Sequence, residues 1–170
     1  IFIQAVDLYV KSTNLKPVIS IASPQYESLI IEILNKHNCK IELFRGSSLE
    51  LMSKATISLV TSGTISLEHC LMRVPHVVAY KFSPVTYFIA TTFFKKTLDK
   101  IKYMSMANTL LDEEVFPELL QEKVTIDEIC IKLKKIYDTK DVIVDKSENL
   151  WTMLDKGNVS KKIAEKILQN

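Results

Sequence analysis

The chain has 170 residues and a formal net charge of +2, and its composition is 47% hydrophobic and 25% charged. This length suffices for one domain with a buried core, and the composition is that of a globular protein. The charge is too small and the lysines are too scattered for a nucleic-acid-binding surface, so we predict no nucleic-acid partner.

The three cysteines, Cys39, Cys70 and Cys130, are far apart and lack a CxxC spacing. They predict neither a disulfide framework nor a zinc site, and they fit a reducing cytoplasm. The sequence has no apolar run of membrane-spanning length and no signal-peptide pattern, so we expect a soluble protein. Because the first residues, from Ile1 on, already have the apolar spacing of a helix interior, we also expect the sequence to be a piece of a longer protein.

Short apolar runs alternate with helical patterns along the first half of the chain. The predicted helices are residues 1–14, 26–38, 47–54 and 64–72, and the predicted strands are residues 18–21, 41–44, 57–60 and 76–80. Ser47 and Glu50 have the spacing of a capping box at the start of the third helix. Short strands separated by helices are typical of a parallel sheet that is covered on both faces. We therefore predict an α/β fold, a Rossmann-like doubly wound parallel sheet with extra C-terminal helices.

The second half of the chain has helices and long connections in place of this alternation. Its predicted helices are residues 85–94, 125–137, 146–154 and 160–169, with a loop that ends near residue 117. The apolar, aromatic stretch 84–96 ends in a lysine pair, which fits either a helix buried between domain halves or contact with a membrane surface or acyl chains. Trp151 is expected to fill a gap in the core or between helices. We divide the chain into a domain at residues 1–140 and C-terminal helices at residues 141–170.

The turn that joins the third predicted strand to the next helix carries the clearest functional pattern. Open α/β sheets bind ligands at the carboxyl ends of their strands, where this turn lies. Gly63 permits a tight turn, Ser62 and Thr64 offer hydroxyls, and the free N–H groups of the first helical turn favour phosphate. Glu68 shares a helix face with Thr64 and can accept hydrogen bonds from a ribose diol. The pattern also fits an ordinary capped turn whose carboxylate is favoured by the helix dipole.

Two histidines lie close to this turn in the sequence. His69 follows Glu68 on the predicted helix, and His76 opens an otherwise apolar strand, so we expect structural roles for both rather than catalytic ones. Cys70 is expected to behave as a small buried residue. The sequence has no DxD motif and no cluster of His and Cys with metal-ligand spacing, so we predict no metal and no cofactor.

Residues 62–84, SGTISLEHCLMRVPHVVAYKFSP, resemble the sugar-nucleotide element of GT-B glycosyltransferases. The blocks VVAYKFSPVTYFIA, KYMSMANTLL and VFPELLQEK resemble a narrower family, lipid A disaccharide synthase. The corresponding blocks of that family are a Tyr-Lys/Arg strand end, a Ser-Leu-Pro-Asn loop and a Glu-Leu-Leu-Gln helix. The resemblance is clear over residues 55–121 and weaker on either side.

The resemblance implies an inverting glycosyltransferase that moves 2,3-diacylglucosamine from UDP to the 6-hydroxyl of 2,3-diacylglucosamine 1-phosphate, giving the β-1,6-linked lipid A disaccharide. Residues 1–140 would then be the UDP-binding half, without its first strand and phosphate loop. The C-terminal helices would pack on this domain or on the N-terminal half. The implied partners are UDP-diacylglucosamine, diacylglucosamine 1-phosphate, the inner face of the bacterial inner membrane and a second copy of the chain.

The resemblance also implies a set of substrate-binding residues. They are Ser62, Gly63, Thr64, Glu68, Tyr80, Lys81, Asn108, Glu118 and Gln121. The first four would lie at the nucleotide, and Tyr80 and Lys81 would border the same crevice, although Lys81 also fits a solvated strand end. Asn108 would reach the diphosphate or the sugar, and Glu118 and Gln121 would shape the adjoining wall.

The chain departs from the family pattern in two ways. Ala107 replaces the proline before Asn108, and because alanine does not fix φ, we expect Asn108 to be held less rigidly. The Gly-Ser-Arg phosphate loop of the family is absent from the sequence, and the general base is expected in the N-terminal half. Another GT-B transferase of UDP-N-acetylglucosamine, the related 2-epimerase and a non-catalytic nucleotide-binding module are the alternatives.

Overall fold

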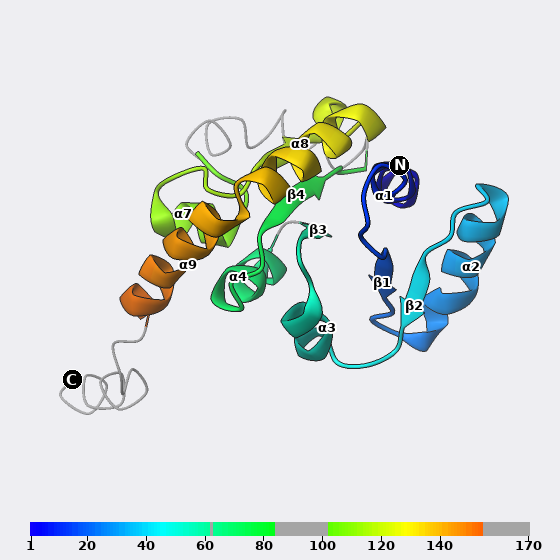
Figure 1. Cartoon of the computed structure of the whole chain (residues 1–170), viewed down its shortest axis with the longest axis horizontal. Coiled ribbons are helices and arrows are strands. Elements are labelled where there is room, and N and C mark those ends of the chain that lie inside the picture. Colours follow the sequence, from blue (N-terminus) through cyan, green and yellow to red (C-terminus); the bar gives the residue numbers. More distant parts are fainter. Residues whose placement is uncertain (62, 84–101, 155–170) are drawn as a thin grey trace.

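The computed structural model describes residues 1–61, 63–83 and 102–154 of the chain (Figure 1). Its elements in chain order are α1 (Phe2–Val10), β1 (Val18–Ser20), the 3-10 helix η1 (Pro24–Tyr26), α2 (Glu27–Lys36), β2 (Glu42–Phe44), α3 (Ser48–Lys54), β3 (Ser58–Val60), α4 (Thr64–Leu71), β4 (His76–Tyr80), α7 (Met106–Leu111), β5 (Glu118–Leu120), the 3-10 helix η2 (Gln121–Lys123), α8 (Ile126–Asp138) and α9 (Lys140–Leu154). None of the helices in these ranges is long and apolar enough to cross a membrane. The predicted helices at residues 85–94 and 160–169 lie outside the described residues.

The strands form two parallel sheets rather than one. β1 pairs with β2, and β4 lies between β3 and β5, parallel to both. In the larger sheet Val78 lies opposite Val60 on one side and opposite Glu118 on the other. The predicted α/β fold with parallel strands is therefore confirmed, and the carboxyl ends of β3, β4 and β5 share one edge.

Burial is concentrated on β4. Its first four residues are buried, with Val77, Val78 and Ala79 fully so, because helices cover both faces of this strand. The core around β4 is formed by α4, α7, α8, α9 and the segment that leads into and includes β5. The largest fully buried side chains of this core are Phe116, Leu119, Ile129, Ile136 and Leu150. The β1–β2 sheet is different, because every residue in its two strands is exposed or half-buried. The predicted coverage of both faces thus holds for β4 but not for β1 and β2.

Helix α1 links the smaller sheet to the larger one by packing on α8 (Figure 1). Ala5 is fully buried there and its carbonyl accepts a hydrogen bond from the Cys130 thiol at 3.4 Å. The Tyr9 hydroxyl donates to the Leu133 carbonyl at 3.5 Å. On the other side of α1, the Asp7 carboxylate accepts from Lys11 and from the Lys40 backbone N–H, and these bonds lower the pKa of Asp7.

Two elements differ in kind from the sequence-based expectation. The Glu-Leu-Leu stretch predicted as a helix is the strand β5, because Leu119 is 1% exposed and the backbone pairs with β4. The region predicted as a loop contains α7, a short helix capped by the Ser105 hydroxyl, which accepts from the Asn108 N–H.

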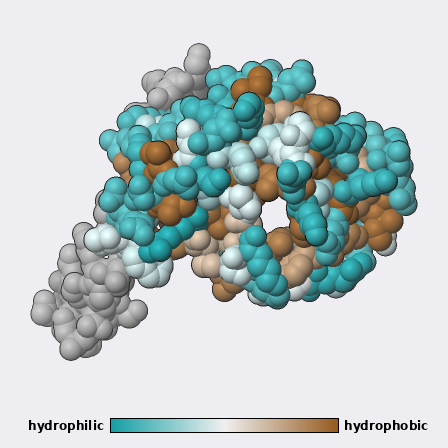
Figure 2. Space-filling model, in the orientation of Figure 1, coloured by the Kyte–Doolittle hydropathy of each residue, from teal (hydrophilic) through white to brown (hydrophobic). Residues whose placement is uncertain are grey.

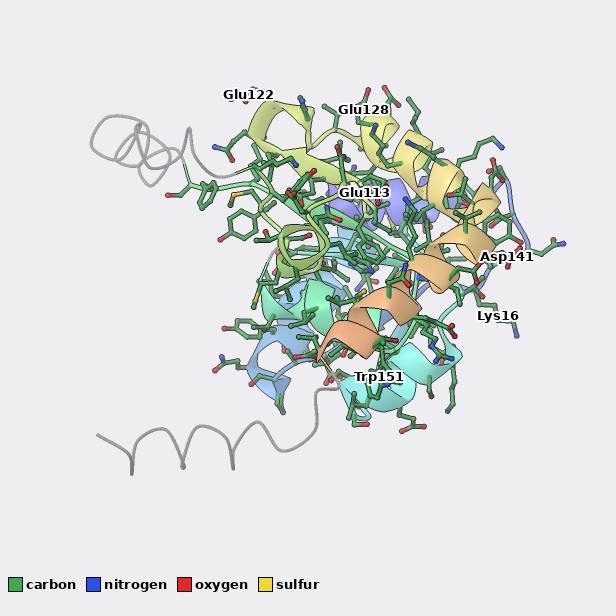
Figure 3. All side chains as sticks on the ribbon, turned by 90° about the vertical axis from the view of Figure 1, so that its left-hand side faces the viewer. Lys16, Glu113, Glu122, Glu128, Asp141 and Trp151 are labelled. Atoms are coloured by element: carbon green, nitrogen blue, oxygen red, sulfur yellow. The ribbon has the colours of Figure 1, made fainter. Side chains whose placement is uncertain are left out.

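Helix α9 starts at Lys140, earlier than predicted, and packs on α4, α7 and α8. Trp151 is 50% exposed, so the expectation that it fills a gap in the core or between helices was wrong (Figure 3).

A buried polar pair joins α4 to β4. The Nδ1–H of His76 donates to the Val74 carbonyl at 2.9 Å, so Nε2 is the acceptor, and the Ser66 hydroxyl donates to it at 2.8 Å. The ring stacks on Phe116 with centroids 3.9 Å apart. Burial lowers the pKa of His76 from 6.5 to about 3, so this histidine stays neutral. His69 is also buried, with its Nδ1 bonded to the Ile65 carbonyl. Both histidines thus make hydrogen bonds inside the fold, and the expectation that neither is catalytic stays a prediction.

We predict that acid weakens the fold through His76. Between pH 6.5 and about 3 the unfolded chain binds a proton on this residue that the folded chain does not. The free energy of unfolding is therefore highest above pH 6.5 and falls as the pH is lowered, by about 3 kcal/mol at pH 4. Urea unfolding at pH 7 and pH 4 measures this loss.

The double variant Ser66→Ala, His76→Phe should lose this part of the pH dependence, because it removes both the imidazole and the hydroxyl that donates to it. The His37→Gln variant, on the exposed end of α2, is the control and should keep the wild-type fall in stability. An undiminished fall in the double variant would contradict the assignment to His76.

Candidate functional site

The turn at Gly63 lies at the carboxyl end of β3 and starts helix α4. Gly63 has φ 111° and ψ −152°, a backbone conformation that residues other than glycine rarely adopt. A Cβ added there would meet no atom within 4 Å, so the backbone angle, and not crowding, requires glycine. No side chain of a described residue caps the helix at this end. Ser62, the remaining hydroxyl of the predicted motif, lies outside the described residues.

Thr64 and Glu68 are both exposed on α4, one turn apart, and so lie on the same face of the helix. Within the described part of the chain the Glu68 carboxylate makes no hydrogen bond and no ion pair. The first turn of α4 presents N–H groups without carbonyl partners, and the positive end of the helix dipole lies at the same place. The turn therefore offers donors for an anion, and Glu68 offers an acceptor one turn further along.

The strands β4 and β5 end at the same edge as this turn, because β3, β4 and β5 are parallel, and β4 is the direct neighbour of β3. Lys81 is exposed directly after β4, and the rings of Tyr80 and Phe82 meet edge to face with centroids 4.6 Å apart. Gln121 follows β5 with φ 53°, and its Oε1 accepts a hydrogen bond from the Phe82 N–H at 2.7 Å. Gln121 thus fixes the path of the chain as it leaves β4.

Glu118 holds the segment that enters α7. Its carboxylate accepts hydrogen bonds from the Met104 N–H at 2.7 Å, from the Ser105 N–H at 3.0 Å and from the Asn108 amide at 2.8 Å. Glu118 is the first residue of β5 and lies level with Val78 at the centre of β4. Through these three bonds the larger sheet determines where α7 begins.

The buried Asn108 side chain bonds both to Glu118 and to the backbone of the segment before β5. Its Nδ2 donates to the Phe116 carbonyl at 2.7 Å as well as to Glu118, and its Oδ1 accepts from the N–H groups of Val115 and Phe116, both at 3.0 Å. The side chain is fully buried, and these bonds use both of its N–H groups and both lone pairs of its oxygen. Ala107 therefore does not leave Asn108 loosely held, contrary to our expectation. A contact between Asn108 and a ligand stays a prediction, and the observed bonds give the residue a positioning role.

The predicted residues thus form two groups. The turn and helix residues Gly63, Thr64 and Glu68 lie with Lys81 and Gln121 at the carboxyl edge, while Glu118 and Asn108 are bonded to each other behind it. Sequence reasoning missed Ser105 and the backbone of Phe82, although the Ser105-x-x-Asn108 spacing is a signal for a helix cap. Among the described residues no three His, Cys, Asp or Glu side chains group as metal ligands.

A hollow of about 340 Å³ lies elsewhere, against the segment that leads into β5. Its lining comes from that segment, α8, the turn after α8 and α9, and comprises Glu114, Val115, Pro117, Lys132, Lys135, Ile136, Thr139, Val142, Ile143 and Lys146. It contains none of the predicted substrate-binding residues. We assign the candidate site to the carboxyl edge because open parallel sheets bind ligands there.

Comparison with known proteins gives a consistent family. The chain matches the family model described as lipid-A-disaccharide synthetase over residues 1–169. The lipid-A-disaccharide synthase of Aquifex aeolicus (strain VF5) is 34% identical over 156 residues, which cover 92% of this chain and 42% of the relative. The lipid-A-disaccharide synthase of Pseudoalteromonas translucida (strain TAC 125) is 36% identical over 137 residues, covering 79% of this chain and 35% of the relative. The corresponding protein of Synechocystis sp. (strain ATCC 27184 / PCC 6803 / Kazusa) is 29% identical over 160 residues, covering 92% and 40%.

The chain thus spans about two fifths of the length of these curated relatives. The match to the family model covers nearly the whole chain, and it includes both the Gly63 turn and the Glu118–Asn108 pair. On these grounds the chain belongs to the lipid-A-disaccharide synthase family.

Proposed function

We propose that this chain binds the UDP part of a UDP-sugar and that the whole protein is an inverting glycosyltransferase. It would transfer 2,3-diacylglucosamine from UDP to the 6-hydroxyl of 2,3-diacylglucosamine 1-phosphate and form the β-1,6-linked lipid A disaccharide. The observation that carries this proposal is the Gly63 turn, a helix start that no described side chain caps, with open space beside Gly63, at the carboxyl edge of a parallel sheet. Family membership supplies the sugar and the acceptor.

In this proposal the described residues act on the leaving group. The acceptor oxygen attacks the anomeric carbon, a base outside these residues takes its proton, and the bond to UDP breaks with both electrons going to the diphosphate. The N–H groups at the start of α4, with the Thr64 hydroxyl, meet the charge that develops there. The exposed Lys81 at the end of β4 adds a positive charge to the same edge. Glu68 accepts hydrogen bonds from the ribose hydroxyls.

In this proposal three residues hold neighbouring segments in place rather than contact the substrate, namely Asn108, Glu118 and Gln121. Gln121 sets the path of the chain after β4, and Glu118 with Asn108 sets the start of α7. Donors aimed at a developing charge are effective only when they are held in place before the reaction, which is what such bonds provide. The acyl chains of both proposed substrates would keep them in a bilayer, so we also propose that the protein acts at the inner face of the inner membrane, in contact with its surface.

We predict that Glu68→Ala weakens UDP binding without weakening the fold. Loss of a charged acceptor for the ribose should lower the affinity roughly tenfold to hundredfold. The melting temperature should not change, because the Glu68 side chain is exposed and makes no bond within the described residues. Calorimetric titration with UDP measures the affinity. The matched control is Glu32→Ala on α2, an exposed glutamate far from this edge, which should bind as the wild type does. Equal affinities for Glu68→Ala and wild type would remove Glu68 from the site.

We predict that Asn108→Ala lowers both stability and UDP binding. The substitution leaves the buried N–H groups of Val115 and Phe116 without an acceptor, which costs about 2–4 kcal/mol of unfolding free energy. Chemical unfolding measures this cost. Thr109→Ala, on the exposed side of α7, serves as the control and should cost much less. A variant at Asn108 with wild-type stability and reduced affinity would instead assign the residue to direct ligand contact.

A further inference from the structure

The hollow beside the segment that leads into β5 lies at the opposite edge of the sheet from the candidate site. Glu114 and Pro117 line the hollow and precede β5, whereas Gln121 follows β5 at the carboxyl edge. A strand rises about 3.3 Å per residue, so Pro117 and Gln121 are roughly 13 Å apart along β5. In Figure 3, Glu122, which follows β5, and Asp141, at the start of α9, lie on opposite sides of the view. The hollow is therefore separate from the candidate site.

Three lysines line this hollow, and two of them have no acidic partner within the described part of the chain. Lys146 forms an ion pair with Glu113. The side chains of Lys132 and Lys135 make no ion pair and no hydrogen bond with any described residue. Glu114, the acidic residue among the lining side chains, is exposed, so water screens its charge. The hollow thus carries positive charge that the described residues do not neutralise.

The stability of the fold does not account for the two unpaired lysines. Lys132 and Lys135 are three residues apart and so lie on one face of α8, where two like charges slightly destabilise a helix. The helix dipole favours Lys135, which is in the last turn, but Lys132 lies outside that turn. Lys132 is also half-buried, although a lysine normally extends its charged end into water. An anion in the hollow would explain both positions.

The deeper part of the hollow is apolar. Val115, Ile136 and Ile143 belong to its lining and are at most 8% exposed, and the more exposed Val142 lies beside them. Figure 2 shows the surface over α8 and α9 as mostly hydrophilic, with smaller hydrophobic areas between the polar ones. The volume of about 340 Å³ is within the range of small-molecule sites. Amines around an apolar floor suit a ligand with an anionic head and an apolar part.

We infer that this hollow binds a phosphate ester whose other part is apolar. The ammonium groups of Lys132 and Lys135 bind the phosphate oxygens, because lysine acts as a point charge that phosphate accepts from several directions. The apolar part covers Val115, Ile136 and Ile143 and removes them from water. The head group of a lipid and a soluble phosphate ester present this same chemistry. The inference does not depend on the proposed function, because the hollow contains none of the candidate-site residues.

The test is calorimetric titration of the chain with hexyl phosphate and with inorganic phosphate. We expect hexyl phosphate to bind roughly tenfold more tightly or better, because its chain covers the apolar floor. The double variant Lys132→Gln, Lys135→Gln should lower the affinity for hexyl phosphate by roughly tenfold or more. The control Lys36→Gln, Lys134→Gln removes the same charge from exposed lysines outside the lining and should bind as the wild type does.

A third variant, Val142→Ser, separates the apolar contact from the charged one. Val142 is 59% exposed, so the substitution should leave the melting temperature unchanged. We expect it to lower the affinity for hexyl phosphate severalfold and to leave the affinity for inorganic phosphate as it is, because only the alkyl chain reaches this side chain.

Equal affinity of the wild type and the double lysine variant for hexyl phosphate would overturn the inference. Equal affinity of the wild type for hexyl phosphate and inorganic phosphate would overturn it too. Displacement of hexyl phosphate by UDP would also contradict it, because the two ligands would then share one site. Simultaneous binding of UDP and hexyl phosphate supports a separate site, whereas a chain that binds hexyl phosphate but not UDP supports the inference and contradicts only the proposed function.

Sedimentation with phosphatidylglycerol vesicles distinguishes the two sources of the ligand. Vesicle binding that hexyl phosphate displaces, and that the double lysine variant loses, would support the inference and identify the ligand as a lipid head group. Binding of hexyl phosphate without binding to vesicles would support it and identify a soluble phosphate ester.

Discussion

The pairing of β4 with a strand on each side is the constraint on which the other features depend. Its backbone bonds to β3 at one edge and to β5 at the other, and its first four side chains are buried. A strand in this position leaves no room for a charged residue, and burial keeps the imidazole of His76 neutral by lowering its pKa to about 3. Because β3, β4 and β5 run in the same direction, their exits meet at one edge. The candidate site is the result of that alignment.

The sequence predicted the elements whose signals are local. β4 was predicted with its observed bounds because an uninterrupted apolar run follows a proline, and α8 was predicted within one residue because Thr125 caps a strongly amphipathic helix. β5 was missed because three residues carry too little periodicity, and its state depends on pairing with a strand some forty residues earlier. α7 was missed for a similar reason. It is held by Glu118, whose role is apparent only when the fold brings it to Met104 and Ser105.

In the candidate site, too, the features with a local sequence signal could be predicted and those that depend on distant contacts could not. The Gly63 turn could be predicted because a glycine between a strand and a helix has a direct conformational meaning, and the observed φ of 111° is one that glycine adopts readily. The exposed position of Glu68 also follows from helical spacing. The positioning role of Asn108 could not be predicted from the sequence. Its side chain makes four hydrogen bonds with backbone groups and a carboxylate, and these groups come close to it only in the folded chain. Family motifs identify residues that matter, but they do not separate a residue that contacts the ligand from one that holds its neighbours.

The packing of α1 on α8 bears on the order in which the chain can fold. Tyr9 bonds to Leu133, which is 124 residues later, and Ala5 bonds to Cys130, which is 125 residues later. During synthesis α1 therefore emerges long before the helix that covers it, and the first sheet has little core of its own to hold it meanwhile. Contacts between such distant residues slow folding because a long loop must close before they form. The amino-terminal third of this sequence should thus become stable only after α8 has formed, although it is made before α8.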